Sequence, residues 1–485
     1  MTPTTLIHDG RVLRRRGSDY ISDRADILIE GSTIREITAS RPEDGLRHDT
    51  VIDASGKLIM PGLINAHTHS YGNLARGTFD ALPLEAWVPY ATAVTVRRTR
   101  EEGYISAMLG IIECVRTGTT AVLDHLAGSI EAQEGALEAY RDAGLRVTMA
   151  PMVSDLPAHT TVKKDLEMPA ELRRSVEALA TPDRQEIIAG QKELFQHWHR
   201  KDGLVSISLG PSGPQRCSEE LLLACGALAN EFDTGIHTHL LESRAQQKYA
   251  YERYGKSMVA YLDDLGLLSS RLSGAHAVWC TEEDLKTIAG TGPVLVHNPW
   301  SNLTLGSGIA PLPQWHESGV VAALGTDGAN CGGNQSMFRA MHLATTLHRS
   351  AANPVQDWIT PSKILAQATE GSAQALHFDS KIGRLEPGFE ADLVILDLSS
   401  SAYIPETDII NQLVLGESGE AVETVLIGGK SVLENKRMVG VDESKIFEAA
   451  RTMLDDILAR NSDLIEAAKL QEKFMREVSH GAHTP

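Results

Sequence analysis

Between residues 61 and 380 the chain alternates eight short apolar segments with stretches of helical pattern. The eight segments, in chain order, are LINAHTH, TTAVLDH, RVTMAPM, LVSISLGPS, TGIHTHLLES, SGAHAVW, PVLVHNP and VVAALGTDG. Repeated strand-then-helix units are typical of a barrel of parallel strands surrounded by helices, which needs about 250 residues. The alternation therefore predicts an α/β fold whose main domain is a TIM-like (β/α)8 barrel.

The segments on either side of this barrel have a different pattern. Residues 1–60 and 381–441 contain short runs rich in β-branched residues, separated by glycine-containing turns. We expect these two stretches to meet in a small β-sandwich domain formed from both termini, with the barrel domain, residues 61–380, inserted between them. Residues 442–485 are charged and helical in pattern, which predicts a C-terminal helical tail at the surface or at an oligomer contact.

The composition excludes several classes of protein. Acidic residues number 64 and basic residues 45, giving a formal net charge of −19, and a nucleic-acid partner would need a basic surface instead. The five cysteines show no paired spacing, the first residues lack the apolar core of a signal peptide, and no apolar run approaches the ~18 residues of a membrane span. We therefore expect a cytoplasmic homo-oligomer, dimer or tetramer, that acts on a small-molecule substrate and binds neither nucleic acid nor membrane.

Side chains of the kinds that bind metals stand at the ends of three predicted strands. His67 and His69 close the first strand, His237 and His239 lie in the fifth, and Asp327 follows the eighth. Residues i and i+2 of a strand point to the same side, so both imidazoles of a His-x-His pair face one point. One such pair alone is equally explained as two polar residues on a strand. Three strand ends that bring ligands to one rim of a barrel predict a divalent-metal site with a position left open for water.

Five ordered motifs resemble a known family. PGLINAHTH, HTHLLES, GAHAVW, HNPWSNLTLGSGIAP and LGTDGAN together resemble the amidohydrolase superfamily, in the branch of cytosine and guanine deaminases, S-adenosylhomocysteine-type deaminases and triazine (atrazine) hydrolases. The resemblance implies four metal ligands, which are His67, His69, His239 and Asp327. His239 is chosen over His237 because the family pattern His-x-x-Glu fits His239 and Glu242, and His237 is then expected in a supporting position.

The resemblance also bears on the number of metals. Some members of the superfamily hold two metals bridged by a carboxylated lysine on the fourth strand, and LVSISLGPS contains no lysine. One divalent metal per chain is therefore expected, with zinc as the first choice and iron or manganese as alternatives. A bound metal of this kind lowers the pKa of water from 15.7 towards ~7 and provides a nucleophile at neutral pH.

Three residues are candidates for moving protons around that metal. Asp327 can accept a proton from water as well as bind the metal. Glu242 resembles the family's proton shuttle to the ring nitrogen and the leaving group, while His276, at the end of the sixth strand, can orient the water and stabilise developing charge. Taken alone, Glu242 is equally a carboxylate at a helix start, and His276 a structural strand-end histidine. Their register with the metal ligands favours catalytic roles.

The motifs do not fix the substrate. Deaminases of S-adenosylhomocysteine and methylthioadenosine carry Gly-Pro-His on the fourth strand and an acid for the ribose hydroxyls after the first. This chain has Ser212 in place of that histidine and no acid in YATAVTVRR. We therefore expect a compact ring without ribose. Candidate substrate-contacting residues on the surrounding strand ends and loops are Tyr71, Trp87, Asp155, Ser212, His297, Asn302 and Cys331.

Several functions are compatible with these residues. The first is hydrolytic deamination of an amino-substituted N-heterocycle of the pyrimidine, purine-base or triazine type. The alternatives are hydrolysis of an amide, urea or carbamate C–N bond, and deamination of a nucleoside of the S-adenosylhomocysteine or methylthioadenosine type. A scaffold protein without catalysis is disfavoured, because such proteins lose metal ligands and this chain keeps them all.

Overall fold

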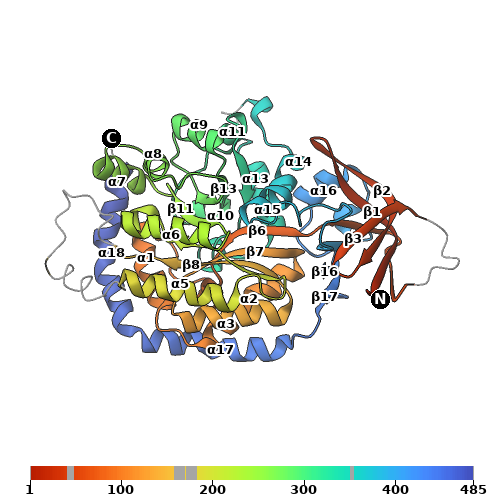
Figure 1. The fold of residues 1–485 in the computed structure, drawn as a ribbon, viewed down its shortest axis with the longest axis horizontal. Coiled ribbons are helices and arrows are strands. Elements are labelled where there is room, and N and C mark those ends of the chain that lie inside the picture. The colour runs from red at the N-terminus through yellow and green to blue at the C-terminus, as the bar shows by residue number, and fades with distance from the viewer. Residues whose placement is uncertain (1, 41–47, 158–169, 171–182, 350–353, 484–485) are drawn as a thin grey trace.

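The computed structural model describes residues 2–40, 48–157, 170, 183–349 and 354–483. A barrel of strands and helices forms the centre, and strands from both ends of the chain gather on one side of it (Figure 1). The last two helices, in blue, pass along the barrel to its far side, so the N- and C-termini lie at opposite ends of the molecule (Figure 1). Within the described ranges no helix is both long enough and apolar enough to cross a bilayer.

All eight predicted barrel strands are present, and the fourth is divided into two short pieces, β9 and β10. In chain order the strands are β6 (Leu63–Thr68), β7 (Thr119–Leu126), β8 (Arg146–Val153), β9 (Val205–Ile207), β10 (Gly210–Pro211), β11 (Ile236–Leu240), β12 (Leu272–His276), β13 (Val294–His297) and β14 (Val321–Leu324). The paired strands run parallel. Every residue of β6 and of β7 is buried, as expected for strands covered on both faces.

Two connections close the barrel. The strands form a five-stranded sheet from β6 to β10 and a four-stranded sheet from β11 to β14. A parallel bridge between Leu209 and Ile236 joins the two sheets on one side. On the other side, the backbone N–H of Asp327 donates to the carbonyl oxygen of His67 over 2.9 Å. The predicted TIM-like barrel is confirmed, and its closing bond joins two of the predicted metal ligands.

Helices follow the strands and cover the outside of the barrel (Figure 1). Their bounds are α1 (Leu84–Thr95), α2 (Arg100–Arg116), α3 (Ile130–Ala143), α5 (Arg184–Trp198), α6 (Glu219–Glu231), α7 (Arg244–Tyr254), α8 (Met258–Asp264), α9 (Glu282–Thr291), α10 (Pro299–Thr304), α11 (Leu312–Glu317), α12 (Ala329–Gly332), α13 (Met337–Thr346), α14 (Pro361–Ala366), α15 (Ser372–Ala375) and α16 (Ile409–Leu415). Local sequence sets many of the starts. Thr99 and Glu102 form a capping box at the start of α2, and Ser243 caps α7 directly after Glu242.

The strands of both termini join in one nine-stranded mixed sheet. Its members are β1 (Thr4–Arg16), β2 (Asp19–Glu30), β3 (Thr33–Ala39), β4 (Thr50–Asp53), β5 (Lys57–Pro61), β15 (Leu393–Asp397), β16 (Val422–Ile427), β17 (Lys430–Glu434) and β18 (Arg437–Met438). β5 pairs antiparallel with β15, and this pairing connects the N-terminal strands to the C-terminal strands. The two ends of the chain, which we expected to meet in a small β-sandwich, therefore meet in one mixed sheet, and the barrel lies between them in sequence.

The C-terminal tail is a pair of helices, α17 (Glu443–Arg460) and α18 (Ser462–His483). α18 packs on α1, where Trp87 shares an apolar cluster with Phe474 and Met475. The hydroxyl of Tyr90 on α1 donates to Glu472 over 2.7 Å, which adds a polar contact to the same interface. Apolar packing of this kind holds the tail against the segment that follows the first barrel strand.

Candidate metal centre

The four predicted ligands and His276 lie where four barrel strands end. His67 belongs to β6 and His69 follows it directly, while His239 lies in β11 and His276 ends β12. Asp327 follows β14 with a φ of 62°, and His276 has a φ of 75°. Left-handed backbone costs a residue other than glycine about 1–3 kcal/mol and is retained mainly at functional sites. Both residues are therefore held in place by the surrounding fold rather than by their own preference.

These side chains converge on one point. The Nε2 atom of His69 lies 3.2 Å from Oδ1 of Asp327 and 3.2 Å from Nε2 of His239. The Nε2 atom of His67 lies 3.6 Å from the same carboxylate oxygen, and Nε2 of His276 lies 3.7 Å from Oδ2. The ligand atoms of His67, His69 and Asp327 all lie within 4.8 Å of one another, and so do those of His67, His239 and His276. The distances fit side chains that could hold a metal ion.

The chemistry of these groups fits a divalent metal. The Nε2 atom of His67 is buried without a hydrogen-bond partner among the described residues. Burial and the neighbouring histidines lower the pKa of His67 well below its usual value and that of His239 to about 3, so both imidazoles are neutral, as metal ligands must be. Burial opposes ionisation of Asp327, yet attraction to His69 and His276 keeps its pKa below the usual range. The cluster therefore offers the neutral nitrogens of His67 and His239 and one carboxylate to a cation.

The remaining ring nitrogens of two ligands are held by backbone carbonyl groups. Nδ1 of His69 donates to the carbonyl oxygen of His125 over 2.5 Å, and Nδ1 of His239 donates to the carbonyl oxygen of Ser212. Such contacts fix the tautomer and the orientation of a metal-binding imidazole, leaving Nε2 free for the ion. The barrel backbone therefore aims both rings at the same point.

His237 occupies the supporting position that the motif implied. Its Nε2 atom lies 2.8 Å from Nδ1 of His67, and its Nδ1 atom lies 2.7 Å from the hydroxyl oxygen of Ser273. The resulting chain of polar contacts runs from β12 through β11 to the ligand on β6. His237 thus orients His67 from behind, whereas its own ring nitrogens already have protein partners.

Glu242 and His276 lie together beside the ligands. Nδ1 of His276 is 3.8 Å from Oε1 of Glu242 and 2.8 Å from Oδ1 of Asn302. Burial, and then repulsion by Asp327 and Glu85, raises the pKa of Glu242 well above its usual value. A carboxylic acid that keeps its proton near neutral pH can protonate a departing group.

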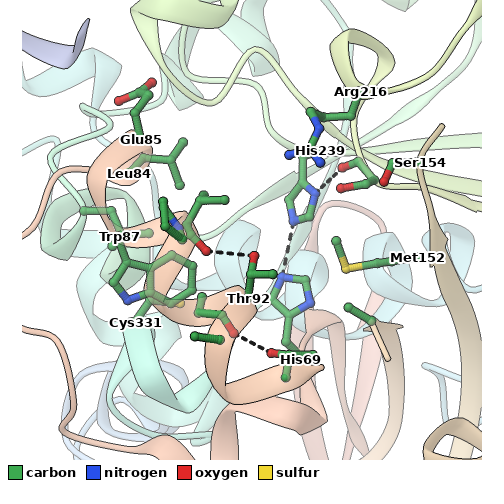
Figure 2. Close-up of a pocket in the computed structure, with 18 of the residues that line it drawn as sticks. His69, Leu84, Glu85, Trp87, Thr92, Met152, Ser154, Arg216, His239 and Cys331 are labelled. Atoms are coloured by element: carbon green, nitrogen blue, oxygen red, sulfur yellow. Dashed lines mark hydrogen bonds between the residues drawn. The ribbon is translucent and has the colours of Figure 1, made fainter. Parts of the chain in front are cut away.

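The site opens into a cavity of about 670 Å³, within the size range of small-molecule sites. Figure 2 shows His69 and His239 in contact, with Trp87, Leu84 and Cys331 on one side and Ser154, Met152 and Arg216 on the other. Besides the metal cluster and Glu242, four residues predicted to contact substrate line the cavity, namely Tyr71, Trp87, Ser212 and Cys331. Burial raises the pKa of the Cys331 thiol, which therefore stays protonated and unreactive.

Three predicted contact residues do not line the cavity. The carboxylate of Asp155 accepts hydrogen bonds from the backbone N–H and the hydroxyl of Ser218, at 2.7 and 2.5 Å, and so secures the start of α6. His297 is fully buried beside Trp315, and Asn302 contacts His276 instead of the cavity. Their side chains support the site from behind the wall.

Sequence reasoning missed three parts of the cavity wall. The C-terminal helix α18 lines it through Leu464, Ala467, Gln471, Met475 and Val478. Glu85 on α1 also lines it, and its carboxylate accepts hydrogen bonds from the hydroxyls of Ser243 and Ser479. Arg216 is the third. The apolar stripe of α18 was the only available signal, and periodicity alone does not say which surface a helix covers.

Comparisons with known proteins agree with these features. The Amidohydrolase family profile matches residues 58–432. A 5-methylthioadenosine/S-adenosylhomocysteine deaminase of Syntrophomonas wolfei is 31% identical over 92% of this chain and 97% of its own length. A 5'-deoxyadenosine deaminase of Methanosarcina acetivorans is 32% identical over 90% of this chain and 94% of its own. The zinc-bound crystal structure of an adenosine deaminase from Xanthomonas campestris has a TM-score of 0.83 and 28% identity, over 94% of this chain and 98% of its own. The chain therefore belongs to the amidohydrolase family, and it is a hydrolase of carbon–nitrogen bonds, as its motifs predicted.

Proposed function

We propose that the protein removes an amino group hydrolytically from an N-heterocycle, with aminopurines as the favoured class. The observation that carries this proposal is Glu242, a buried acid with a raised pKa at the edge of the histidine cluster. Loss of ammonia from a ring needs protonation of the ring nitrogen and then of the leaving amine. A protonated carboxyl beside the site can supply the first proton, and it can supply the second after it has taken up a proton that the attacking water loses. Both relatives described above are named as deaminases, which supports the same reaction class.

We further propose that one ion, zinc, is held by four side chains, His67, His69, His239 and Asp327. When bound, a divalent metal acidifies a water molecule and so makes a nucleophile available at neutral pH. The zinc bound to the adenosine deaminase of Xanthomonas campestris supports the choice of metal. The absence of lysine from β9 and β10 supports a single ion rather than a bridged pair.

The remaining residues of the site have separate tasks in this proposal. Asp327 accepts the first proton of the attacking water. Glu242 gives its own proton to the ring nitrogen, takes up a proton that the water has lost and passes it to the amine. His276, anchored on Asn302 at 2.8 Å, hydrogen-bonds the water and stabilises the charge that develops on it. Trp87 and Tyr71 supply aromatic surfaces in the cavity wall against which a flat ring can lie.

A nucleoside is the second candidate substrate, and two observations favour it. The cavity of about 670 Å³ extends from the metal ligands to α18, so size gives no reason to exclude a sugar. Glu85 adds a carboxylate to the cavity wall, although Ser243 and Ser479 already donate to it. Against this candidate stands Ser212, where the nucleoside deaminases of this branch carry a histidine.

Release of ammonia by the zinc-loaded protein tests both candidates. The panel contains free bases (adenine, guanine and cytosine), an aminotriazine, the nucleosides 5'-deoxyadenosine and 5'-methylthioadenosine, and a urea and a carbamate. We expect turnover of an aminated ring, with kcat/KM for nucleosides within tenfold of that for the free purine bases. A tenfold or larger preference for nucleosides would establish the second candidate. Hydrolysis of the urea or carbamate without release of ammonia from any ring would contradict the proposed reaction.

A further inference from the structure

Arg216 is a cation in the cavity wall whose place is not explained by the metal site. It ends the short 3-10 helix Pro214–Arg216, which follows β10 and leads into α6. The segment that carries Arg216 begins at Ser212, whose carbonyl oxygen accepts the hydrogen bond from Nδ1 of His239. Arg216 lines the cavity on the side of His239 and Ser154, across from Leu84 and Trp87 (Figure 2).

The base of this side chain is held firmly. Nε of Arg216 donates to the carbonyl oxygen of Leu156 over 3.2 Å, and the backbone N–H of Leu156 donates to the carbonyl oxygen of Arg216 over 3.1 Å. The backbone N–H of Ser212 donates to the carbonyl oxygen of Val153 over 2.9 Å, and Ser218 contacts Asp155 at 2.7 Å. The segment that carries Arg216 is therefore hydrogen-bonded to the end of β8 and to the residues that follow β8, both before and after Arg216 in the sequence. One nitrogen is used for anchoring, and the two terminal nitrogens have no partner among the described residues.

The other charged groups of the cavity are already accounted for. The second arginine in the wall, Arg97, forms an ion pair with Asp463 at 2.9 Å. Glu85 accepts from two serine hydroxyls, and Glu242 lies beside His276. Arg216 thus has no carboxylate partner among the described residues.

Arg216 is partly buried, and partial burial makes a guanidinium less favourable when its terminal nitrogens have no partner. The surrounding protein lowers the pKa of Arg216 below its usual value, because burial penalises the charge and the Cys217 thiol opposes that effect only in part. A cation that is withdrawn from water is normally paired or fully hydrogen-bonded, because its desolvation is otherwise unfavourable. Planar donors at a fixed orientation are well suited to an oxygen pair or a carbonyl oxygen.

We propose that the terminal nitrogens of Arg216 bind an electron-rich oxygen of the substrate, either a ring keto oxygen or a carboxylate. The proposal rests on the proposed function, because it places the aminated ring between the metal ligands and Arg216. His239 and Arg216 belong to one side of the cavity, so the amino carbon lies at the metal end and the oxygen lies along that wall. Arg216 is then a specificity-determining residue and takes no part in proton transfer.

Two matched pairs of probes test this assignment. Guanine and 2-aminopurine carry the same amino group, and only guanine has the keto oxygen. S-Adenosylhomocysteine and 5'-methylthioadenosine share the thioether nucleoside, and only the first has a carboxylate. Binding is measured by calorimetry on zinc-loaded protein that carries Glu242→Gln, so that turnover does not interfere. The variants added to this background are Arg216→Met, Arg216→Lys and Arg97→Met.

We expect the oxygen-bearing member of one pair to bind about 10- to 100-fold more tightly than its partner, as charge-assisted hydrogen bonds allow. Arg216→Met should remove that preference, while Arg216→Lys, which keeps the charge without the planar fork, should keep part of it. Arg97→Met should change both members of a pair alike, since Asp463 already neutralises Arg97. The pair that responds identifies the source of the oxygen.

Three results would overturn the assignment. They are failure of both oxygen-bearing probes to bind, equal binding within both pairs, and a preference that survives Arg216→Met. A melting temperature near that of the parent shows that the Met variant is folded, and Arg216→Lys provides a second test if it is not. Release of ammonia by the wild-type protein is measured separately. If ammonia is released but the two probes of each pair bind equally, only the role of Arg216 is contradicted. If the oxygen-bearing probe is preferred but no ammonia is released, only the proposed reaction is contradicted.

Discussion

The two ends of the cavity are built in different ways. At the metal end the side chains stand on strand ends of the barrel, and neither His67 nor Asp327 exposes more than 4% of its side chain. At the outer end the wall comes from α1 and α18, whose side chains Glu85, Gln471 and Met475 reach the cavity from separate helices. Backbone hydrogen bonds join neighbouring barrel strands within each sheet, whereas the described hydrogen bonds between α1 and α18 come from side chains, as in the pair Tyr90 and Glu472.

This difference suits two separate tasks, catalysis at the metal end and recognition of the rest of the substrate at the outer end. Catalytic groups must stay within a fraction of an ångström of their working positions, so a rigid strand end is the suitable support. Groups that recognise the rest of a substrate tolerate change, and they lie on loops and helices that vary without disturbing the barrel. We therefore expect substitutions at the metal end to lower kcat, and substitutions at the outer end to raise KM.

The largest expected effect is that of Glu242→Gln. An amide of the same shape cannot carry a proton, so kcat should fall by about 10²–10⁴-fold or more while zinc stays bound. Steady-state ammonia release and elemental analysis of the same sample measure the two quantities. Turnover within a few-fold of the wild-type value would show that Glu242 takes no part in the mechanism. It would also contradict the proposed difference between the metal end and the outer end of the cavity.

The second prediction concerns stability at the metal end. Burial, and then His348 and His276, lower the pKa of His297 to about 3. Between pH 6.5 and 3, His297 is therefore protonated in the unfolded chain and neutral in the folded chain. The free energy of unfolding falls as the pH falls through this range. From pH 7 to pH 5 this single group should cost about 2 kcal/mol.

Urea unfolding of the metal-free protein at pH 7 and pH 5 measures this loss. In His297→Leu the drop between the two pH values should be smaller than in the wild type by about 2 kcal/mol. Other buried histidines titrate in both proteins, so the comparison isolates His297. Equal drops in the two proteins would show that His297 is not held neutral in the fold.

The smallest expected effect is that of Glu85→Gln, a carboxylate-to-amide change in the same cavity as Glu242. The amide accepts fewer hydrogen bonds from Ser243 and Ser479, so α18 should pack less firmly against α1. The cost of one such contact is about 1 kcal/mol, and we expect KM to rise by less than tenfold. The fall in kcat should be far smaller than in Glu242→Gln, because burial, the largest cause of the raised pKa of Glu242, is unchanged. A fall in kcat as large as that of Glu242→Gln would contradict the separation of chemistry from selection.

The metal end could be predicted from the sequence because the geometry of a strand determines where its side chains lie from their order in the sequence. Two histidines at i and i+2 point to one side, and the ends of parallel strands meet at one rim, so His67 and His69 could be placed with Asp327 before any coordinates. The motifs also gave His237 its supporting position, 2.8 Å from His67.

The outer end could not be predicted in this way. The contact between α18 and α1 joins segments almost 400 residues apart in the chain, such as Glu85 and Ser479. Periodicity shows that a helix has an apolar face, but it does not identify the partner of that face. Arg216 was missed for a related reason, since a single arginine in a turn is usually exposed, and only its packing against Leu156 places it in the cavity wall.

The central claim is that one metal ion at the barrel end carries the chemistry. The most direct test is to strip the protein of metal, add zinc in measured steps, and follow ammonia release together with the zinc bound per chain. The rate should be close to zero without zinc, rise in proportion to bound zinc, and stop rising at one ion per chain. A rate that is unaffected by stripping, or that continues to rise to two ions per chain, would contradict the account.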